Sequence, residues 1–245
     1  MTYLSPPVLG DSQLQSETLE SLTSAVRYHA WLTSLASPFL GDHPIELGSG
    51  LGDYAQAWLD GGMERIRVTE RDPVRLAMLK ERFADDLRVH ADDLDVFNAP
   101  PADHSCFVAY NVLEHIEDDV GALRAAHRIV RPGGAVVMIV PAFPFAMGRF
   151  DREVGHVRRY TKESLRRAYE NAGLTIEELY YLNAPGLLAW FIGMRLLRMT
   201  PRDGVTVRLW DRVVVPIARR IESRWRPPFG QSLVARGRVP AASTR

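Results

Sequence analysis

Residues 45–54 constrain the fold of this chain more than any other segment. They read Ile-Glu-Leu-Gly-Ser-Gly-Leu-Gly-Asp-Tyr, a short apolar run followed by glycines at alternate positions. Glycine lets a backbone turn sharply and lets a ligand approach the main chain, because it has no Cβ. The segment therefore predicts a strand, a tight turn and the start of a helix whose free N–H groups face a ligand.

The spacing of these glycines indicates the kind of ligand. The dinucleotide-binding fingerprint needs its third glycine one place after Gly52, where this chain has Asp53. A carboxylate at the mouth of the turn suits a ligand with a cationic group better than one with a pyrophosphate. S-adenosylmethionine (SAM), which carries an ammonium and a sulfonium, is such a ligand.

Apolar periodicity predicts strands that alternate with helices along most of the chain. Strands are expected at 45–47, 66–70, 87–91, 106–110, 135–140, 174–182 and 232–239, and helices within 17–40, 53–60, 73–83, 118–130, 161–173, 186–199 and 205–224. Residues 1–14 are expected to be a loose leader, and Arg131-Pro132-Gly133-Gly134 to end a helix. Such alternation implies right-handed crossovers and a doubly wound, mostly parallel α/β sheet.

The 245 residues fit one domain, with N-terminal helices in 1–40, a cofactor-binding core in 41–182, a helical insertion in 183–228 and a final strand in 229–240. The formal net charge of zero gives no indication of nucleic acid binding. No secretory signal is apparent, and the longest apolar segment, 186–199, is shorter than the roughly 20 residues that span a bilayer. We therefore expect a cytoplasmic protein.

Polar residues follow the predicted strands where those strands end. Glu46 and Gly48 end the first strand, Glu70 the second and Asn111 the fourth. In open α/β sheets, ligands bind outside the carboxyl ends of the strands. Glu70 lies about 18 residues after Gly52, close to the spacing at which an acidic side chain accepts both hydroxyls of a ribose. The alternative is a solvated charge at the end of a strand.

Five segments, in order and on the expected elements, carry a family resemblance. They are Glu46–Gly52, Glu70, Leu94-Asp95, Asn111–Ile116 and Arg131–Gly134. With these segments the chain resembles the class I SAM-dependent methyltransferases over about residues 28–182. The resemblance implies a Rossmann-like, seven-stranded fold, here with a helical insertion before the last strand, and SAM as the cofactor.

The resemblance also implies roles for particular residues. The implied cofactor-binding residues are Glu46, Gly48, Ser49, Gly50, Gly52, Glu70, Arg71, Leu94, Asp95, Asn111 and Val112. Asp93 competes with Asp95 for the adenine, because Asp92-Asp93-Leu94-Asp95 permits two registers. Tyr28, His29 and Trp31 are similar to a Tyr-Asn-x-Trp element of some of these enzymes, but His29 replaces the Asn, so helix packing is the alternative.

Methyl transfer is an in-line displacement, in which the enzyme mainly holds the reacting atoms in line. For a hydroxyl or ammonium acceptor a base must also remove a proton. His115 is the first candidate and His156 the second, although His115 is equally compatible with a structural role in its loop. The spacing of the remaining histidines predicts no metal site, and we expect no metal.

A polar cluster lies between residues 149 and 160, in the connection after the fifth strand. Arg158, Arg159 and Tyr160 are candidates to bind an acceptor, and Phe145 just upstream could line an apolar pocket for it. The alternative is a salt-bridged loop in which Asp151 and Glu153 neutralise the arginines.

The expected function is methyl transfer to a small organic acceptor, for example in the biosynthesis of a specialised metabolite. One alternative is a lipid-linked or isoprenoid acceptor at a membrane surface, reached through the helices in 186–224. Another is a cofactor-binding partner subunit without catalysis. Methylation of nucleic acid is disfavoured because Val112-Leu113, and not Pro-Pro-Tyr, follows Asn111. We expect a monomer or a homodimer.

Overall fold

The computed structural model describes residues 10–101, 104–190 and 204–241. These residues form a seven-stranded sheet in the order β3-β2-β1-β4-β5-β7-β6. The strands are β1 (Ile45–Leu47), β2 (Ile66–Thr69), β3 (Val89–Asp92), β4 (His104–Tyr110), β5 (Val130–Pro141), β6 (Thr175–Leu182) and β7 (Ser232–Arg238). β7 is antiparallel to both of its neighbours, whereas β1 to β5 pair in parallel. The predicted doubly wound, mostly parallel sheet is confirmed.

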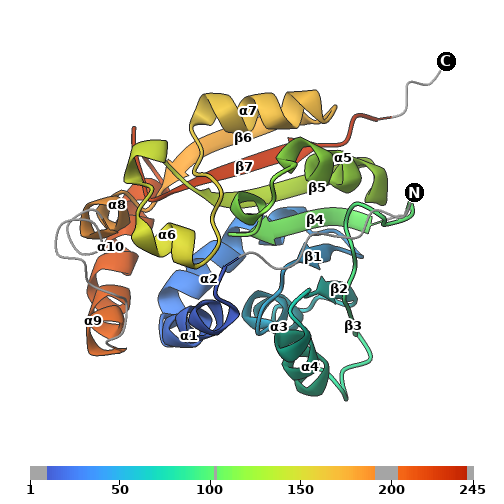
Figure 1. Ribbon diagram of the computed structural model, residues 1–245, viewed down its shortest axis with the longest axis horizontal. Helices are drawn as coiled ribbons and strands as arrows, with labels where there is room; N and C mark the ends of the chain where they lie inside the picture. The colour runs from blue at the N-terminus through green and yellow to red at the C-terminus, as the bar shows by residue number, and fades with distance from the viewer. Residues whose placement is uncertain (1–9, 102–103, 191–203, 242–245) are drawn as a thin grey trace.

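Helices cover both faces of this sheet (Figure 1). The helices are α1 (Ser12–Thr23), α2 (Val26–Ala36), α3 (Asp53–Asp60), α4 (Pro73–Arg82), α5 (Asp119–Ile129), α6 (Arg149–Glu153), α7 (Lys162–Asn171), α8 (Ala184–Trp190), α9 (Gly204–Leu209) and α10 (Val215–Glu222). Within the described ranges, three 3-10 turns, η1 (Ser37–Phe39), η2 (Leu113–His115) and η3 (Pro144–Ala146), and a π-helical turn, η5 (Trp210–Val214), are also present. α5 and α7 pack on one face in one apolar core, and α2, α3, α4 and α10 pack on the other face in a second.

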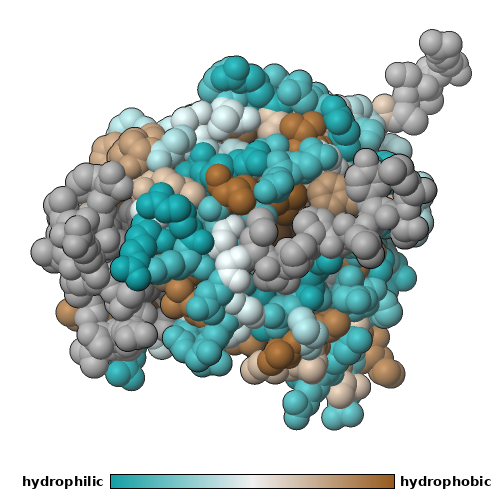
Figure 2. Space-filling model, in the orientation of Figure 1, coloured by the Kyte–Doolittle hydropathy of each residue, from teal (hydrophilic) through white to brown (hydrophobic). Residues whose placement is uncertain are grey.

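Local sequence explains where several of these helices begin. The side chain of Asp72 accepts hydrogen bonds from the backbone N–H groups of Val74 and Arg75, and Pro73 opens α4. The side chain of Thr161 accepts from the N–H of Ser164 at the start of α7. Both helices begin within one residue of the predicted start. Hydrophilic side chains cover most of the described surface in the view of Figure 2, with smaller apolar patches among them.

The fifth strand is longer than predicted. β5 begins at Val130, directly after α5, and contains the Arg131–Gly134 segment that was expected to end the helix. His104 pairs with Val130 and Cys106 with Ala135, so the register shifts between these pairs. The extra residues on β5 form an irregularity there, with Gly133 at a φ of 79°.

Two other boundaries also differ from the prediction. β3 covers Val89–Asp92 and not 87–91, and the side chain of Leu87 is fully exposed. α1 begins at Ser12, so residues 12–14, predicted as part of a loose leader, are helical. This difference matters for function, because the start of α1 contacts two other parts of the chain.

The insertion before β7 is helical where the structure describes it. The predicted helix at 186–199 is described only as far as Trp190, in α8, and the rest of it lies outside the described residues. The helix predicted at 205–224 corresponds to α9, η5 and α10 in succession. The carboxylate of Asp211 accepts hydrogen bonds from the backbone N–H groups of Arg27 and Tyr28, which ties this helix to the start of α2. Among the described helices, none has the length and apolar character needed to cross a membrane.

Candidate active site

The turn between β1 and α3 requires glycine at three positions. Gly48, Gly50 and Gly52 have φ values of 67°, 55° and 82°, in the left-handed region that other residues rarely adopt. A Cβ on Gly48 would lie 2.6 Å from Cγ2 of Val112, and one on Gly52 would lie 2.6 Å from Cε2 of Phe83. The glycines therefore serve both the backbone conformation and close packing.

Glu46 is the buried acidic group of this turn. Its side chain is 2% exposed, and among the described residues its Oε2 has no hydrogen-bond partner. Burial raises the pKa of Glu46 to about 8, against a hydrogen bond with Ser49 that acts to lower it. Asp53, in contrast, is paired with Arg82 at 2.7 Å. The carboxylate oxygen available for a ligand's cation therefore belongs to Glu46, a better fit for the ammonium of SAM than Asp53.

Glu70 lies beside the turn, at the end of β2. Its Oε2 accepts a hydrogen bond from the backbone N–H of Gly50 at 3.1 Å. Its Oε1 accepts from the N–H of Asp72 at 2.8 Å and lies 3.4 Å from Nη2 of Arg75. Ionised carboxylate oxygens offer about four acceptor sites in all, so these three contacts leave about one for a ribose hydroxyl.

The residues predicted for the adenine lie after β3. Asp95 is half-buried, and its Oδ1 accepts from the backbone N–H of Phe97 at 3.1 Å and lies 3.6 Å from Nη1 of Arg71. Leu94 is partly buried and packs against the apolar core on the α5 side of the sheet. Asp93, the competing residue, is exposed. Arg71 and Asp95 thus lie close together at the carboxyl ends of the strands, where Glu70 also lies.

The bend after β4 contacts the glycine turn directly. Asn111 adopts a φ of 54°, a conformation in which Asn is enriched, and its N–H donates to the carbonyl of Ile139 at 2.8 Å. Val112 lies against Gly48, as the short distance to a Cβ there indicates. The structure therefore places Asn111 and Val112 next to the turn that is predicted to hold SAM.

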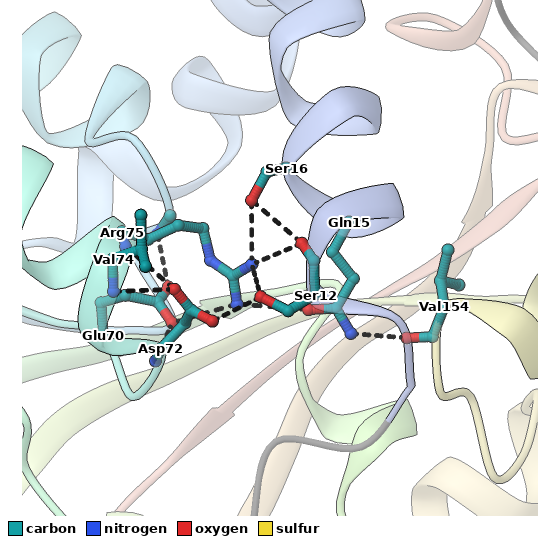
Figure 3. A network of polar contacts seen from close by, with 9 residues as sticks. Ser12, Gln15, Ser16, Glu70, Asp72, Val74, Arg75 and Val154 are labelled. Atoms are coloured by element: carbon teal, nitrogen blue, oxygen red, sulfur yellow. Dashed lines mark hydrogen bonds and ion pairs between the residues drawn. The ribbon is translucent and has the colours of Figure 1, made fainter.

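Helix α1 covers this region, a contact that the sequence reading missed. Figure 3 shows Arg75 of α4 between Glu70 and the start of α1. Its Nη2 donates to Oε1 of Gln15 at 3.2 Å, and its Nη1 donates to Oγ of Ser16 at 3.3 Å. The hydroxyl of Ser12 donates to Asp72. No local pattern marks these contacts, because they join residues about 60 positions apart.

The other side of α1 contacts the loop after α6. The side-chain amide of Gln15 donates to the carbonyl of Val154 at 2.7 Å (Figure 3), and the N–H of Asp11 donates to the carbonyl of Glu153 at 2.8 Å. Figure 1 shows α1 and α6 at the same end of the sheet. α1 therefore bridges the predicted ribose region and the loop that carries His156.

Both histidines predicted to be catalytic come together. The rings of His115, in η2, and His156, after α6, lie 4.7 Å apart between centroids at an interplanar angle of 85°. Burial, together with the nearby His156, lowers the pKa of His115 to about 4. Nδ1 of His156 lies 2.9 Å from Oδ1 of Asp151. Burial acts to raise the pKa of Asp151, but hydrogen bonds from His156 and Arg159 outweigh it and keep that pKa low.

Glu114, next to His115 in η2, has no role predicted from the sequence. Its side chain is fully buried, and neither of its carboxylate oxygens has a hydrogen-bond partner among the described residues. Oε1 lies 3.8 Å from Nε2 of His156, too far for a hydrogen bond. Burial raises the pKa of Glu114 to about 7.

The predicted acceptor-binding residues lie in the same loop but differ in exposure. Arg159 is buried, and its guanidinium donates to Asp151 at 2.6 Å. The hydroxyl of Tyr160, also buried, donates to Asp119 at 3.0 Å. Arg158 pairs with the same Asp119 at 2.8 Å. The Arg159–Asp151 contact corresponds to the salt-bridged loop considered above, Arg158 and Tyr160 contact the start of α5 instead, and Phe145 is 61% exposed.

Known proteins that resemble this chain are methyltransferases over part of its length. Residues 45–138 match the family model described as a methyltransferase domain. The chain is 35% identical over 94 residues to the malonyl-[acyl-carrier protein] O-methyltransferase of Pseudescherichia vulneris. That alignment covers 38% of this chain and 36% of the relative, so it spans about a third of the relative's length.

Similar solved structures show the same fold at low sequence identity. One belongs to the complex between the Haloferax volcanii Trm112 methyltransferase activator and a methyltransferase, with a TM-score of 0.62 and 17% identity over 94% of this chain and 99% of that one. Another is the [4+2]-cyclase SpnF, with a TM-score of 0.60 and 17% identity over 97% of this chain and 100% of that one.

The fold and the family match together define the class. The sheet order β3-β2-β1-β4-β5-β7-β6 with an antiparallel β7 is that of the Rossmann-like methyltransferases. Residues 45–138 thus match the methyltransferase-domain family, for which SAM is the implied methyl donor.

Proposed function

We propose that this protein is an enzyme that transfers a methyl group from SAM to a small organic acceptor. The observation that carries the proposal is the buried carboxylate of Glu46, whose Oε2 has no partner among the described residues, at the base of a turn with three glycines of positive φ. Such a turn admits a ligand to the main chain, and such a carboxylate is balanced by a ligand's ammonium.

Each part of the site then has a role. Glu46 binds the ammonium of SAM, Glu70 accepts a hydrogen bond from the ribose, and Asp95 with Leu94 contacts the adenine. Bound SAM supplies an electrophilic methyl group on its sulfonium. The protein holds the acceptor's nucleophile in line with that carbon and sulfur, and orientation of this kind contributes several kcal/mol to catalysis.

The acceptor lies, in this proposal, over η2 and the loop after α6. His115 and His156 lie there with their rings 4.7 Å apart, and both are at the end of the sheet where the cofactor residues gather. Phe143, which adopts a φ of 63°, stacks on Tyr181 at 4.8 Å between centroids beside this loop. Strained residues of this kind are found where a site fixes a ligand's position.

Binding of the product cofactor tests the proposal. Titration calorimetry with S-adenosylhomocysteine is expected to show one site per chain with micromolar-range affinity, and titration with NAD⁺ is expected to show no binding. The fold alone does not decide the chemistry, because the [4+2]-cyclase SpnF has a similar fold. Transfer of label from methyl-labelled SAM to fractions of a small-molecule extract then tests catalysis. Binding of NAD⁺ without S-adenosylhomocysteine would contradict the proposal.

A second candidate, an acceptor with a lipid tail at a membrane surface, is favoured by one feature of the insertion. Along α9, η5 and α10, large apolar side chains at every fourth position are exposed. They are Leu209, Val213, Ile217, Ile221 and Trp225, with exposed fractions of 48–63%. Arginines at the preceding positions, 208, 212, 220 and 224, are exposed too.

We infer that this apolar stripe and its arginines dock on an anionic lipid surface. An apolar face flanked by Arg is the pattern of a helix that lies in a membrane interface, where the arginines are attracted to anionic headgroups. Burying a large apolar side chain contributes about 1.5–3 kcal/mol, so several together suffice for reversible binding.

Vesicle flotation tests this second candidate. The full chain is expected to float with phosphatidylglycerol-containing vesicles and less with pure phosphatidylcholine, and salt should weaken the binding. The double variant Ile217→Ser/Ile221→Ser should lose flotation, whereas Val74→Ser/Met78→Ser, on the exposed side of α4, should not. Membrane docking would be contradicted if the wild-type chain floated with neither kind of vesicle. It would also be contradicted if the wild type were a dimer that Ile217→Ser/Ile221→Ser dissociated and the control variant did not.

A further inference from the structure

Three side chains beside the predicted acceptor position offer metal ligands to one point. Glu114, His115 and His156 each present one ligand atom, and these atoms all lie within 4.8 Å of one another. His115 and Glu114 are adjacent in η2, whereas His156 comes from the loop after α6, 41 positions later than His115. This separation explains why the spacing of histidines in the sequence did not predict a site.

The carboxylate of Glu114 is the strongest indication that something binds here. It is fully buried, and among the described residues neither oxygen has a hydrogen-bond partner. Buried polar groups are almost always satisfied, so an unpartnered carboxylate calls for a ligand. Nε2 of His156 is 3.8 Å from Oε1 of Glu114, close to the roughly 3.3 Å that separates two ligands held at about 2.0–2.1 Å around one tetrahedral ion.

The imidazoles are also held in the way that metal-binding histidines are. Nδ1 of His156 lies 2.9 Å from Oδ1 of Asp151, a hydrogen bond that assigns the proton to Nδ1 and leaves the lone pair of Nε2 toward Glu114. The backbone of Gly155 hydrogen-bonds the ring of His115. Outer carboxylate and carbonyl partners of this kind orient histidine ligands and fix their tautomer.

The charges around the cluster suit a divalent cation. Asp151 is neutralised by Arg159, whose Nη2 lies 2.6 Å from its Oδ1, so Asp151 does not itself need the ion. Glu114 lacks such a close cationic partner, and two imidazoles with one carboxylate are borderline donors that suit Zn²⁺ and other first-row divalent metals better than Mg²⁺.

We propose that Glu114, His115 and His156 form a binding site for a first-row divalent transition metal, with Asp151 as the outer partner of His156. The site would deepen the proposed function, and its role there rests on that function. An acceptor hydroxyl bound to the ion would lose its proton to solvent water more readily, so that the ion would activate the nucleophile while the histidines serve as ligands.

Metal binding can be measured without any methyl transfer, so its failure is distinct from failure of the proposed function. The full chain without an affinity tag, dialysed against a chelator, is titrated with Zn²⁺, Mn²⁺ and Mg²⁺, and bound metal is counted by mass spectrometry. We expect about one equivalent of Zn²⁺ or Mn²⁺ with low-micromolar or tighter affinity, and at least about 100-fold weaker binding of Mg²⁺.

Variants of the ligands complete the test. Glu114→Gln, which preserves side-chain shape, and His156→Ala should each weaken binding by more than the roughly 10- to 100-fold that loss of an outer partner costs. His90→Ala, which removes an exposed imidazole beside Asp92, should bind like the wild type. Thermal unfolding checks that Glu114→Gln is folded. Less than a tenth of an equivalent in the wild type, or unchanged binding in folded Glu114→Gln, would overturn the site.

Discussion

The guanidinium of Arg75 lies 3.4 Å from the carboxylate of Glu70, with both side chains buried beside the glycine turn. The same guanidinium donates to Gln15 and Ser16 in α1. One side chain thus links the residue predicted to bind the ribose to the helix that covers it. Because α1 also reaches the loop after α6 through Gln15 and Val154, a change at Arg75 is expected to affect both sides of the site.

Removal of the Arg75 guanidinium should loosen α1. Arg75→Met keeps most of the side-chain volume but removes every donor, at a cost of about 1–2 kcal/mol in the docking of α1. Amide hydrogens of α1 should therefore exchange about 5–30-fold faster with deuterium. Lys80→Met, on the exposed side of the same helix, is the matched control and should leave exchange unchanged. Equal exchange in both variants would mean that Arg75 does not hold α1.

Loss of the Glu70 charge should weaken cofactor binding. Glu70→Gln retains the shape of the side chain but replaces charged acceptors, whose hydrogen bonds contribute about 1.5–3 kcal/mol. We expect the affinity for S-adenosylhomocysteine, measured by calorimetry, to fall about 10- to 150-fold. Glu64 is exposed and lies just before the start of β2, so Glu64→Gln serves as the control and should bind S-adenosylhomocysteine normally. Wild-type affinity in Glu70→Gln would exclude the ribose assignment.

The raised pKa of Glu46 predicts proton release when the cofactor binds. With a pKa of about 8, Glu46 is mostly protonated in the free protein at pH 7. An ammonium beside it favours the ionised form and lowers that pKa, so up to one proton is released at pH 7 and almost none at pH 9. Calorimetry in buffers of different ionisation enthalpy measures the proton count. Glu46→Gln should bind more weakly and release no proton at either pH, and release that persists in this variant would assign the proton elsewhere.

The parts of the fold that the sequence predicts well are those set by local chemistry. Alternating glycines, the Asp72-Pro73 cap and the apolar β4 each specify their own element, and neighbouring elements then fix the sheet. Arg131–Gly134 was predicted only to end the helix, and α5 does end just before it, but pairing of Val130 and Ala135 with β4 also places the segment in β5. Tertiary pairing overrode the local preference.

The residues of the candidate site likewise divide into those that the sequence predicts and those that it does not. The residues on the glycine turn and at the strand ends follow from topology, since parallel strands end at one edge. The contact of Gln15 with Arg75 and the approach of His156 to Glu114 depend on how distant segments dock, and no spacing in the sequence encodes either. The burial of Arg159 and Tyr160, both predicted to bind the acceptor, also depends on such docking, since Arg159 donates to Asp151 in its own loop and Tyr160 to Asp119 at the start of α5.

Asp151 should contribute more to stability than any exposed ion pair of the same loop. Its buried carboxylate accepts from Arg159, His156 and the backbone N–H of Gly148. Asp151→Asn leaves the Arg159 charge buried and uncompensated, which costs about 3–5 kcal/mol. For a chain of this size that loss lowers Tm by about 6–20 °C in a thermal unfolding scan.

The matched control for Asp151→Asn is Glu153→Gln, which breaks the exposed pair with Arg149 and should cost less than about 1 kcal/mol. The pH dependence gives a second check. Because the pKa of Asp151 is lowered from its usual 3.8 by folding, its stabilisation is present above pH 3.8 and is lost as the pH falls through the folded-state pKa. The difference in Tm between wild type and Asp151→Asn should therefore shrink in acid. A difference that stays constant down to acid unfolding would mean that the carboxylate's charge is not what stabilises the loop.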